Sequence, residues 1–89
     1  MKLLEEMMLV KVADEYMVVP TARGTENFSG VVRLNVTGKD IWEGVGQGLG
    51  QEQIAEMLVN KYEDVDFETA LGNVKRIVET LKKEGLILD

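Results

Sequence analysis

The sequence predicts an α+β domain of winged-helix type, in which a three-stranded antiparallel sheet precedes three helices and a short C-terminal strand. Three observations lead to this prediction. The runs rich in β-branched residues come before residue 35, apolar residues take helical spacing from residue 37 onward, and an apolar tail follows Gly85. The chain has 89 residues, enough for one hydrophobic core, so we expect a single domain over residues 1–89.

The three strands are expected near the start of the chain. Met8 to Ala13 and Tyr16 to Val19 are β-prone runs, and Asp14-Glu15 between them predicts a hairpin. Pro20 is expected to end the second strand, because proline has no amide donor. A third strand should begin near Val31, after a polar connection. Such a small sheet needs helices to cover its apolar face.

The first helix is expected to begin at Thr37. This threonine is a good N-cap, and Asp40 three residues later completes a pattern that satisfies two helix-start amides. Ile41 and Trp42 fall on one side of the helix, and we expect the glycines after Glu43 to end it early. As the largest side chain in a small domain, Trp42 is favoured as a core anchor over a stacking platform for a ligand.

Two further helices are expected. Gly50 precedes the second, whose apolar stripe consists of Ile54, Ala55, Leu58 and Val59. Asp66 should cap a third and longer helix that runs to about Glu84, with Gly85 as its left-handed C-cap. The apolar stripe of this helix consists of Phe67, Ala70, Leu71, Val74, Ile77, Val78 and Leu81. Leu86-Ile87-Leu88 then predicts the short final strand.

The composition excludes most catalytic chemistry. The chain has neither histidine nor cysteine, so Cys–His and Ser–His–Asp nucleophiles and His or Cys zinc sites are impossible within it. The alternating glycines from Gly44 to Gly50 do not form a phosphate-binding motif, and a flexible interhelical turn is favoured. These absences exclude most classes of enzyme, and we expect no cofactor.

Charged residues cluster in two places on the expected third helix. The acids at its start lack the spacing of a calcium loop, so a structural role is favoured over a cation site: Glu63, Asp64, Asp66 and Glu68. The basic residues Lys75, Arg76, Lys82 and Lys83 form either a solvated helix face or a surface that holds an acidic partner. The net charge of −6 opposes nucleic-acid binding. No apolar run could span a bilayer and no secretory signal is recognisable, so we expect a cytoplasmic protein with no membrane partner.

Several motifs resemble those of the PqqD-like family, named for the small D protein of pyrroloquinoline quinone biosynthesis. The most distinctive is Leu34-Asn35-x-Thr37-Gly38 followed by Ile41-Trp42. Other matching segments are Tyr16-Met17-Val18-Val19, Pro20, Asn27-Phe28-Ser29-Gly30, Asp64-Val65-Asp66 and the Leu81 to Ile87 ending. The glycine-rich segment from Gly44 to Gly50 departs from the family, whose members often extend the first helix here with leucines and acids.

The resemblance implies a peptide adaptor that is not an enzyme. Such proteins bind the leader region of a ribosomally made precursor peptide and deliver it to a modifying enzyme, often a radical S-adenosylmethionine enzyme. The peptide is expected to add as a strand beside the third strand, in a cleft walled by the third helix. Our candidate peptide-binding residues are Val31, Val32, Arg33, Leu34, Val74, Lys75, Val78 and Lys82. Lys75 and Lys82 could steer acidic leader residues, and periodicity alone leaves open which helix positions face the cleft.

Two alternatives remain open. A winged-helix protein that binds DNA or a transcription partner would have the same architecture, but its recognition helix should be basic, and the second helix holds Lys61 against Glu52 and Glu56. A free strand edge could instead pair with a second copy of the chain. We therefore expect a monomer or a weak homodimer that does not bind nucleic acid.

Overall fold

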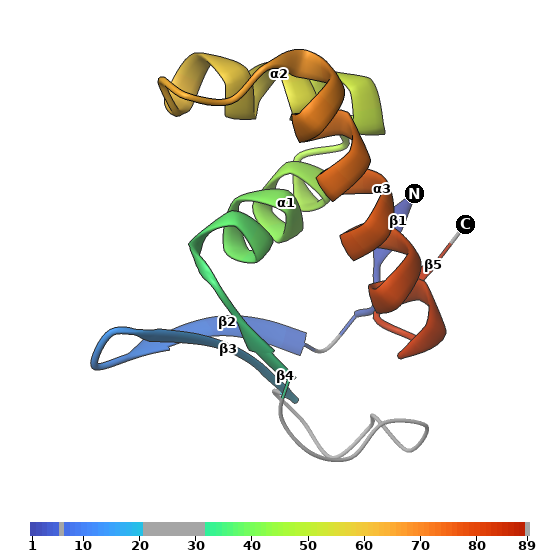
Figure 1. Cartoon of the computed structure of the whole chain (residues 1–89). Coiled ribbons are helices and arrows are strands. Elements are labelled where there is room, and N and C mark those ends of the chain that lie inside the picture. Colours follow the sequence, from blue (N-terminus) through green and yellow to red (C-terminus); the bar gives the residue numbers. More distant parts are fainter. Residues whose placement is uncertain (6, 21–31, 89) are drawn as a thin grey trace.

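The predicted order of strands and helices is confirmed, with one additional strand at the start of the chain (Figure 1). The computed structural model describes residues 1–5, 7–20 and 32–88. Its elements are β1 (Lys2–Leu3), β2 (Met7–Val12), β3 (Glu15–Pro20), β4 (Val32–Leu34), α1 (Val36–Gly46), α2 (Gln51–Lys61), α3 (Phe67–Lys83) and β5 (Ile87–Leu88). The predicted Val31 and the segment Asn27 to Gly30 lie outside the described residues.

Strands β2, β3 and β4 form one antiparallel sheet in that order, whereas β1 pairs with β5 in a separate two-stranded sheet. The hairpin between β2 and β3 has a two-residue loop, as predicted, but the loop lies one residue earlier. Val12 pairs with Glu15, which leaves Ala13 and Asp14 as its loop. Ala13 takes a positive φ of 56°, a conformation that usually requires glycine, and this removes it from the predicted strand.

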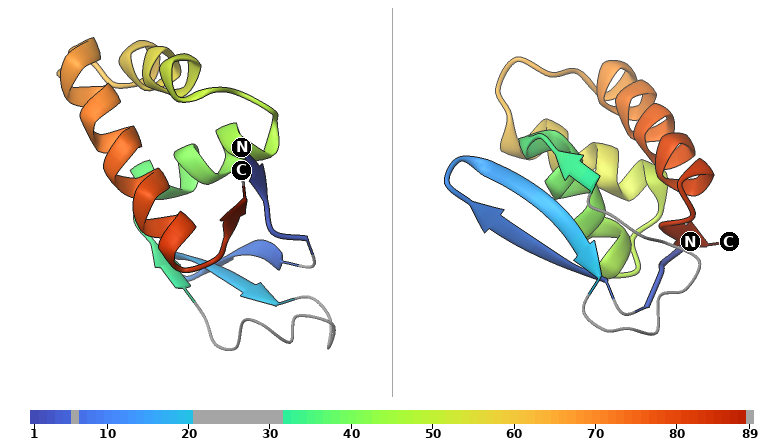
Figure 2. Two further views of the ribbon diagram at one scale, coloured as in Figure 1. Left: turned by 90° about the vertical axis from the view of Figure 1, so that its right-hand side faces the viewer. Right: turned by 90° about the horizontal axis from the view of Figure 1, so that it is seen from below.

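The two faces of the three-stranded sheet differ in their surroundings. Cross-strand pairing puts Leu9, Val18 and Val32 on one face, where Val18 belongs to the core and the other two pack against it. The three helices lie on one side of this sheet (Figure 2). The opposite face is also apolar, with Met8, Val10, Val12, Met17 and Val19, yet these residues do not belong to the core. Met8 and Val12 are 47% and 53% exposed. One apolar face of the sheet is therefore left without a partner among the described residues.

Helix α1 begins and ends at residues other than those predicted. Asn35, not Thr37, is the N-cap, and its Oδ1 accepts a hydrogen bond of 2.7 Å from the amide of Gly38. Asparagine caps at least as well as threonine, and it comes two residues earlier. The helix also continues through Gly44 and Gly46. A Cβ at Gly44 would lie 2.8 Å from Cγ1 of Ile54, so this glycine permits close packing of α1 on α2.

The predicted start of α2 and both predicted ends of α3 are confirmed, whereas α2 continues through Asn60 and Lys61, which the sequence placed in the connection. The side chain of Gln53 accepts from the amide of Gly50 at the start of α2, and Asp66 caps α3 by accepting from the amide of Thr69 at 2.7 Å. At the end of α3, Gly85 has a φ of +81°. The amides of Gly85 and Leu86 donate to the carbonyls of Lys82 and Leu81, which is the Schellman arrangement. This turn directs β5 back onto the core beside β1.

The core lies between the three helices and the inner face of the sheet. Trp42 is 5% exposed, which confirms it as a core anchor. The other buried apolar residues are Val18, Ile41, Val45, Ile54, Ala55, Leu58, Ala70, Val74, Val78, Leu81, Leu86 and Ile87. Val18 is the one member from the three-stranded sheet, so the helices supply most of this core.

Candidate functional site

Strand β4 is an edge of the three-stranded sheet. It pairs with β3 through Val32, Arg33 and Leu34, and no strand in the described part of the chain lies on its other side. Backbone N–H and C=O groups that point away from a neighbouring strand can accept another strand. The edge of β4 is thus an open site for main-chain hydrogen bonds.

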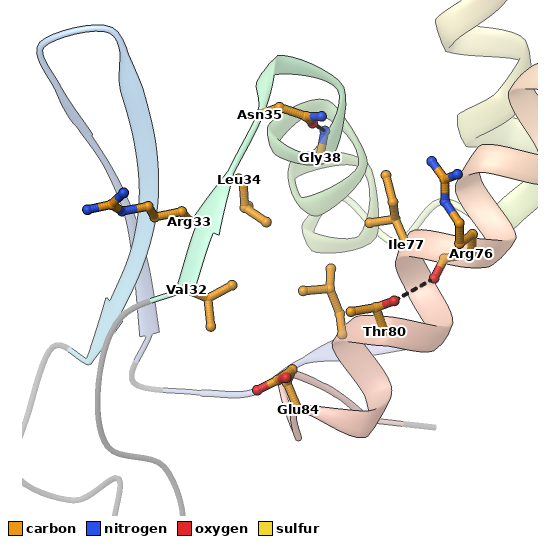
Figure 3. A pocket seen from close by; sticks show the side chains of 10 residues that line it. Val32, Arg33, Leu34, Asn35, Gly38, Arg76, Ile77, Thr80 and Glu84 are labelled. Carbon is orange, nitrogen blue, oxygen red and sulfur yellow. Dashed lines mark hydrogen bonds between the residues drawn. The ribbon is translucent and has the colours of Figure 1, made fainter.

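A groove of about 480 Å³ separates this edge from the C-terminal half of α3. Its strand wall is formed by Val32, Arg33 and Leu34. Figure 3 shows the side chains of Val32 and Leu34 pointing toward α3, while Arg33 points away toward the hairpin. There the guanidinium of Arg33 lies 3.8 Å from the carboxylate of Glu15, and both side chains are mostly exposed. The side chains of β4 that point into the groove, Val32 and Leu34, are therefore both apolar.

The helix wall combines apolar and charged side chains. Ile77 lies opposite β4, with Arg76, Thr80 and Glu84 along the same side of the helix end (Figure 3). Leu81 also lines the groove. The Thr80 hydroxyl donates to the backbone carbonyl of Arg76 at 3.0 Å, so it is already satisfied within the helix. Arg76 and Glu84 are eight residues apart, or about 12 Å along the axis. A ligand in the groove would meet a cation and an anion at separate positions.

The start of α1 closes one end of the groove. Asn35 and Gly38 both line it, and the capping bond between them fixes the turn from β4 into α1. A Cβ at Gly38 would lie 3.2 Å from Oδ1 of Asn35 and 3.4 Å from Cβ of Leu34. Within the Leu-Asn-x-Thr-Gly motif, asparagine thus caps the helix and glycine leaves room for the cap and for Leu34.

The predicted site residues fall into two groups in the structure. Val32, Arg33 and Leu34 line the groove, while Val31 lies outside the described residues. Val74 and Val78 are 0% and 1% exposed and belong to the core. Lys75 lies beside a separate hollow with Leu71 and Gly50, and Lys82 is not among the groove-lining residues. None of the four residues predicted on α3 lines the groove, which instead meets the neighbouring flank of the apolar stripe.

This displacement has a physical reason. The residues closest to the centre of the apolar stripe face α1 and α2, because that is where the helix buries most area. Ile77, on the flank of the stripe, and the buried Leu81 line the groove toward β4. The sequence signal that could have located the groove is the partly polar flank itself, where Arg76, Thr80 and Glu84 recur at helical spacing beside Ile77.

A buried acid anchors α1 behind the groove. Asp40 is 3% exposed, and its carboxylate accepts from Lys61 Nζ at 2.8 Å and Tyr62 OH at 2.5 Å, with Lys39 Nζ at 2.9 Å. Burial raises the pKa of Asp40, but the hydrogen bonds from Lys61, Tyr62 and Lys39 outweigh it and hold the pKa below its ordinary value. The same contacts raise the pKa of Lys39 and of Tyr62. Asp40 thus ties α1 to the end of α2.

The described residues contain no group of acids placed to hold a metal ion. Of the acids near the start of α3, Asp66 serves as the helix cap through its carboxylate. The hydrogen bond from the Thr69 amide lowers the pKa of Asp66. Within the same residues, no helix combines the length and the apolar character that crossing a bilayer requires.

Comparisons with known proteins agree with this architecture. Residues 9–87 match the family model described as coenzyme PQQ synthesis protein D (PqqD). A solved structure of TbiB1 in complex with the TbiA(beta) leader peptide is 22% identical, with a TM-score of 0.75 over 100% of both chains. A lasso peptide synthetase B1 complexed with the leader peptide is also 22% identical, with a TM-score of 0.78 over 99% of this chain and 96% of that one. These two likenesses establish the fold. A search of the curated proteins found no match.

Proposed function

Because the chain belongs to the PqqD family, we propose that it is a non-catalytic adaptor that binds the leader region of a ribosomally made precursor peptide. The observation that carries this proposal is the open edge of β4 beside a groove lined by Ile77 and Leu81. The leader peptides bound to TbiB1 and to lasso peptide synthetase B1, which share this fold, support it.

Strand addition accounts for both affinity and selectivity. A peptide that extends the sheet at β4 forms main-chain hydrogen bonds whatever its sequence, and alternate side chains point into the groove. There, apolar side chains would contact Val32, Leu34 and Ile77. β2 also has an edge without a partner among the described residues, but none of the three hollows described for this part of the chain is lined by a β2 residue. The apolar walls favour β4.

The charges in the groove set a register for the peptide. Figure 3 places Glu84 near the Val32 end of the groove and Arg76 nearer its Asn35 end. An acidic leader residue is favoured beside Arg76 and a basic one beside Glu84. Charge complementarity of this kind acts mainly on encounter and register. This assigns to Arg76 the steering role that the sequence suggested for Lys75 and Lys82.

An adaptor also needs a surface for the enzyme that modifies the peptide, for which a radical S-adenosylmethionine enzyme is our candidate. The outward face of the sheet suits this role, since it carries Met8, Val12 and Met17 outside the core. It adjoins β4, so an enzyme docked there would lie next to the bound peptide. Replacing Met8 and Val12 by lysine should slow processing by the enzyme while peptide affinity stays within twofold. Weaker peptide binding with unchanged processing would argue against this face.

DNA binding fits the structure less well. Lys61 is the one basic residue of α2, and it bonds to the buried carboxylate of Asp40. Glu52 and Glu56 are exposed on the same helix, where a DNA recognition helix would present cations to phosphate. The geometry therefore favours a peptide over a nucleic acid as the partner.

A nuclear magnetic resonance titration tests the proposal. The probe is a synthetic leader peptide of the precursor encoded beside the gene. We expect it to shift the amide resonances of Val32 to Leu34 and of the C-terminal half of α3. Thr80→Trp fills the groove without removing a core contact and should weaken binding at least about tenfold, or about 1.4 kcal/mol. The matched control Glu79→Trp lies on the same helix outside the groove and should bind within twofold. Equal binding by both variants would contradict the proposed site.

A further inference from the structure

A second hollow, of about 320 Å³, lies along the same side of α3 as the groove. We propose that it is a continuation of the peptide site, which takes an apolar residue flanked by lysine or arginine from the part of the peptide that precedes the strand-forming segment. This inference rests on the proposed function and adds a specificity to it. Its basis is the position, the lining and the charge of the hollow.

The two hollows adjoin on both of the elements that border them. On α1, Thr37 lines the second hollow and the next residue, Gly38, lines the groove. On α3, Asn73 lines the second hollow and Ile77, one turn further, lines the groove. The four-residue step from Asn73 to Ile77 rises about 6 Å along the helix, roughly the span of two residues of an extended chain. A peptide that leaves the groove past Leu34 therefore reaches the second hollow directly.

The direction of the peptide follows from the direction of β4. The strand runs from Val32 toward α1 (Figure 3). Since Thr37 of α1 lines the second hollow, the C-terminal end of β4 lies nearest that hollow. A peptide that pairs antiparallel with β4 runs the opposite way. Its residues before the paired segment then lie over Thr37 and Asn73. The second hollow would thus contact the N-terminal flank of the bound segment.

The lining of the second hollow defines the kind of residue that fits. Its floor is apolar, since Leu58 and Ala70 are almost fully buried and Val65 packs against the core. Its rim carries Glu63 and Asp64, which are exposed. In the described residues neither carboxylate forms an ion pair. A peptide with an apolar side chain next to a lysine or arginine would therefore fit, because the apolar side chain would contact the floor and the cation would pair with a carboxylate at the rim.

The charge of the second hollow also distinguishes it from the groove. The groove contains both Arg76 and Glu84, whereas the charged residues that line the second hollow are both acidic. An exposed ion pair contributes about 0.2–1 kcal/mol, so one cation at this rim should raise affinity roughly threefold. A threefold difference in affinity is enough to favour some peptides over others, while most of the binding free energy comes from other contacts. Basic residues are therefore expected upstream of the strand and acidic ones beside Arg76.

Selection from a displayed library of random dodecapeptides tests this inference on the intact chain. Three immobilised proteins are compared: the wild type, a Glu63→Lys and Asp64→Lys double variant, and a Glu56→Lys and Glu79→Lys double variant. The last has the same change in charge on exposed residues away from both hollows. Cooperative unfolding of each protein is verified first. Enriched peptides are then aligned on their strand-forming segment.

We expect wild-type binders to be enriched roughly threefold in lysine or arginine on the N-terminal flank, next to an apolar residue. The Glu63→Lys and Asp64→Lys variant should replace that preference by aspartate or glutamate, and the control variant should keep it. If all three proteins enrich peptides with the same flank, the second hollow is not a subsite and the adaptor function stands. If the wild type enriches no peptide, the adaptor function and the subsite both fail.

Discussion

Replacing Asp40 by asparagine should destabilise the domain far more than a surface mutation would. Asparagine keeps the shape of the side chain but lacks the charge that Lys39 and Lys61 face. The carboxylate accepts from Lys61 and Tyr62 and pairs with Lys39, all within 2.9 Å. Bonds to a charged group contribute about 1.5–3 kcal/mol each, but the Lys61 side chain is 47% exposed, so solvent reduces its share. We expect a loss of about 3 kcal/mol.

Urea unfolding followed by fluorescence measures this loss, because the chain has one tryptophan and Trp42 is buried. For a domain of this size, about 3 kcal/mol corresponds to a fall in Tm of about 12–24 °C. The control is Glu56→Gln, the same change from acid to amide at an exposed position of α2, and it should change stability by less than about 0.5 kcal/mol. If Asp40→Asn also falls within that limit, the carboxylate does not hold α1 to α2 as described.

The pH dependence of the free energy of unfolding also tests the role of Asp40, because the direction of its change with pH is defined. The pKa of Asp40 in the folded protein lies below its ordinary value of 3.8, so its contribution is present above that pH. As the pH falls below 3.8 and through the folded-state pKa, the carboxylate is protonated and the contribution is lost. The difference in unfolding free energy between wild type and Asp40→Asn should therefore be constant near neutral pH and shrink in acid. A difference that grows in acid would refute this.

Three further substitutions test the backbone interpretation, each by urea unfolding. Gly44→Ala should destabilise by about 1–3 kcal/mol, since its Cβ would lie 2.8 Å from the side chain of Ile54; no loss would mean that α1 and α2 are not so closely packed. Gly72→Ala should stabilise by about 1 kcal/mol, because this exposed position within α3 has no atom within 4 Å of an added Cβ; a loss would reveal a contact there. Ala13→Gly should stabilise by about 1 kcal/mol, because it relieves a positive φ; a loss would place the hairpin turn elsewhere.

The sequence predicted the order of elements because the period of its apolar residues changes near Asn35. It also located the ends of α3, since Asp66 and Gly85 occur where a cap and a left-handed turn are needed. The start of α1 was wrong because Asn35 and Thr37 can both cap, and only the structure decides between them. Strand β1 was missed because two residues are too few to show an alternation of apolar and polar side chains. Its residues pair only with β5, at the other end of the chain.

The site was harder to predict than the fold. The β-branched run predicted the third strand, and the family resemblance put the candidate site beside it, where Val32 and Leu34 line the groove. The helix side depends on how α3 is rotated against β4, which the stripe of apolar residues does not specify. Asp40 was taken for part of a cap, because its partners Lys61 and Tyr62 lie 21 and 22 residues further along the chain. Contacts over such separations have no local sequence signal.

A structure of the protein bound to its leader peptide tests the central claim most directly. The account predicts a fourth strand on the sheet, in the order β2-β3-β4-peptide, with peptide side chains between β4 and α3. A peptide bound along the outer edge of β2, or bound without main-chain hydrogen bonds to Val32 to Leu34, would contradict it.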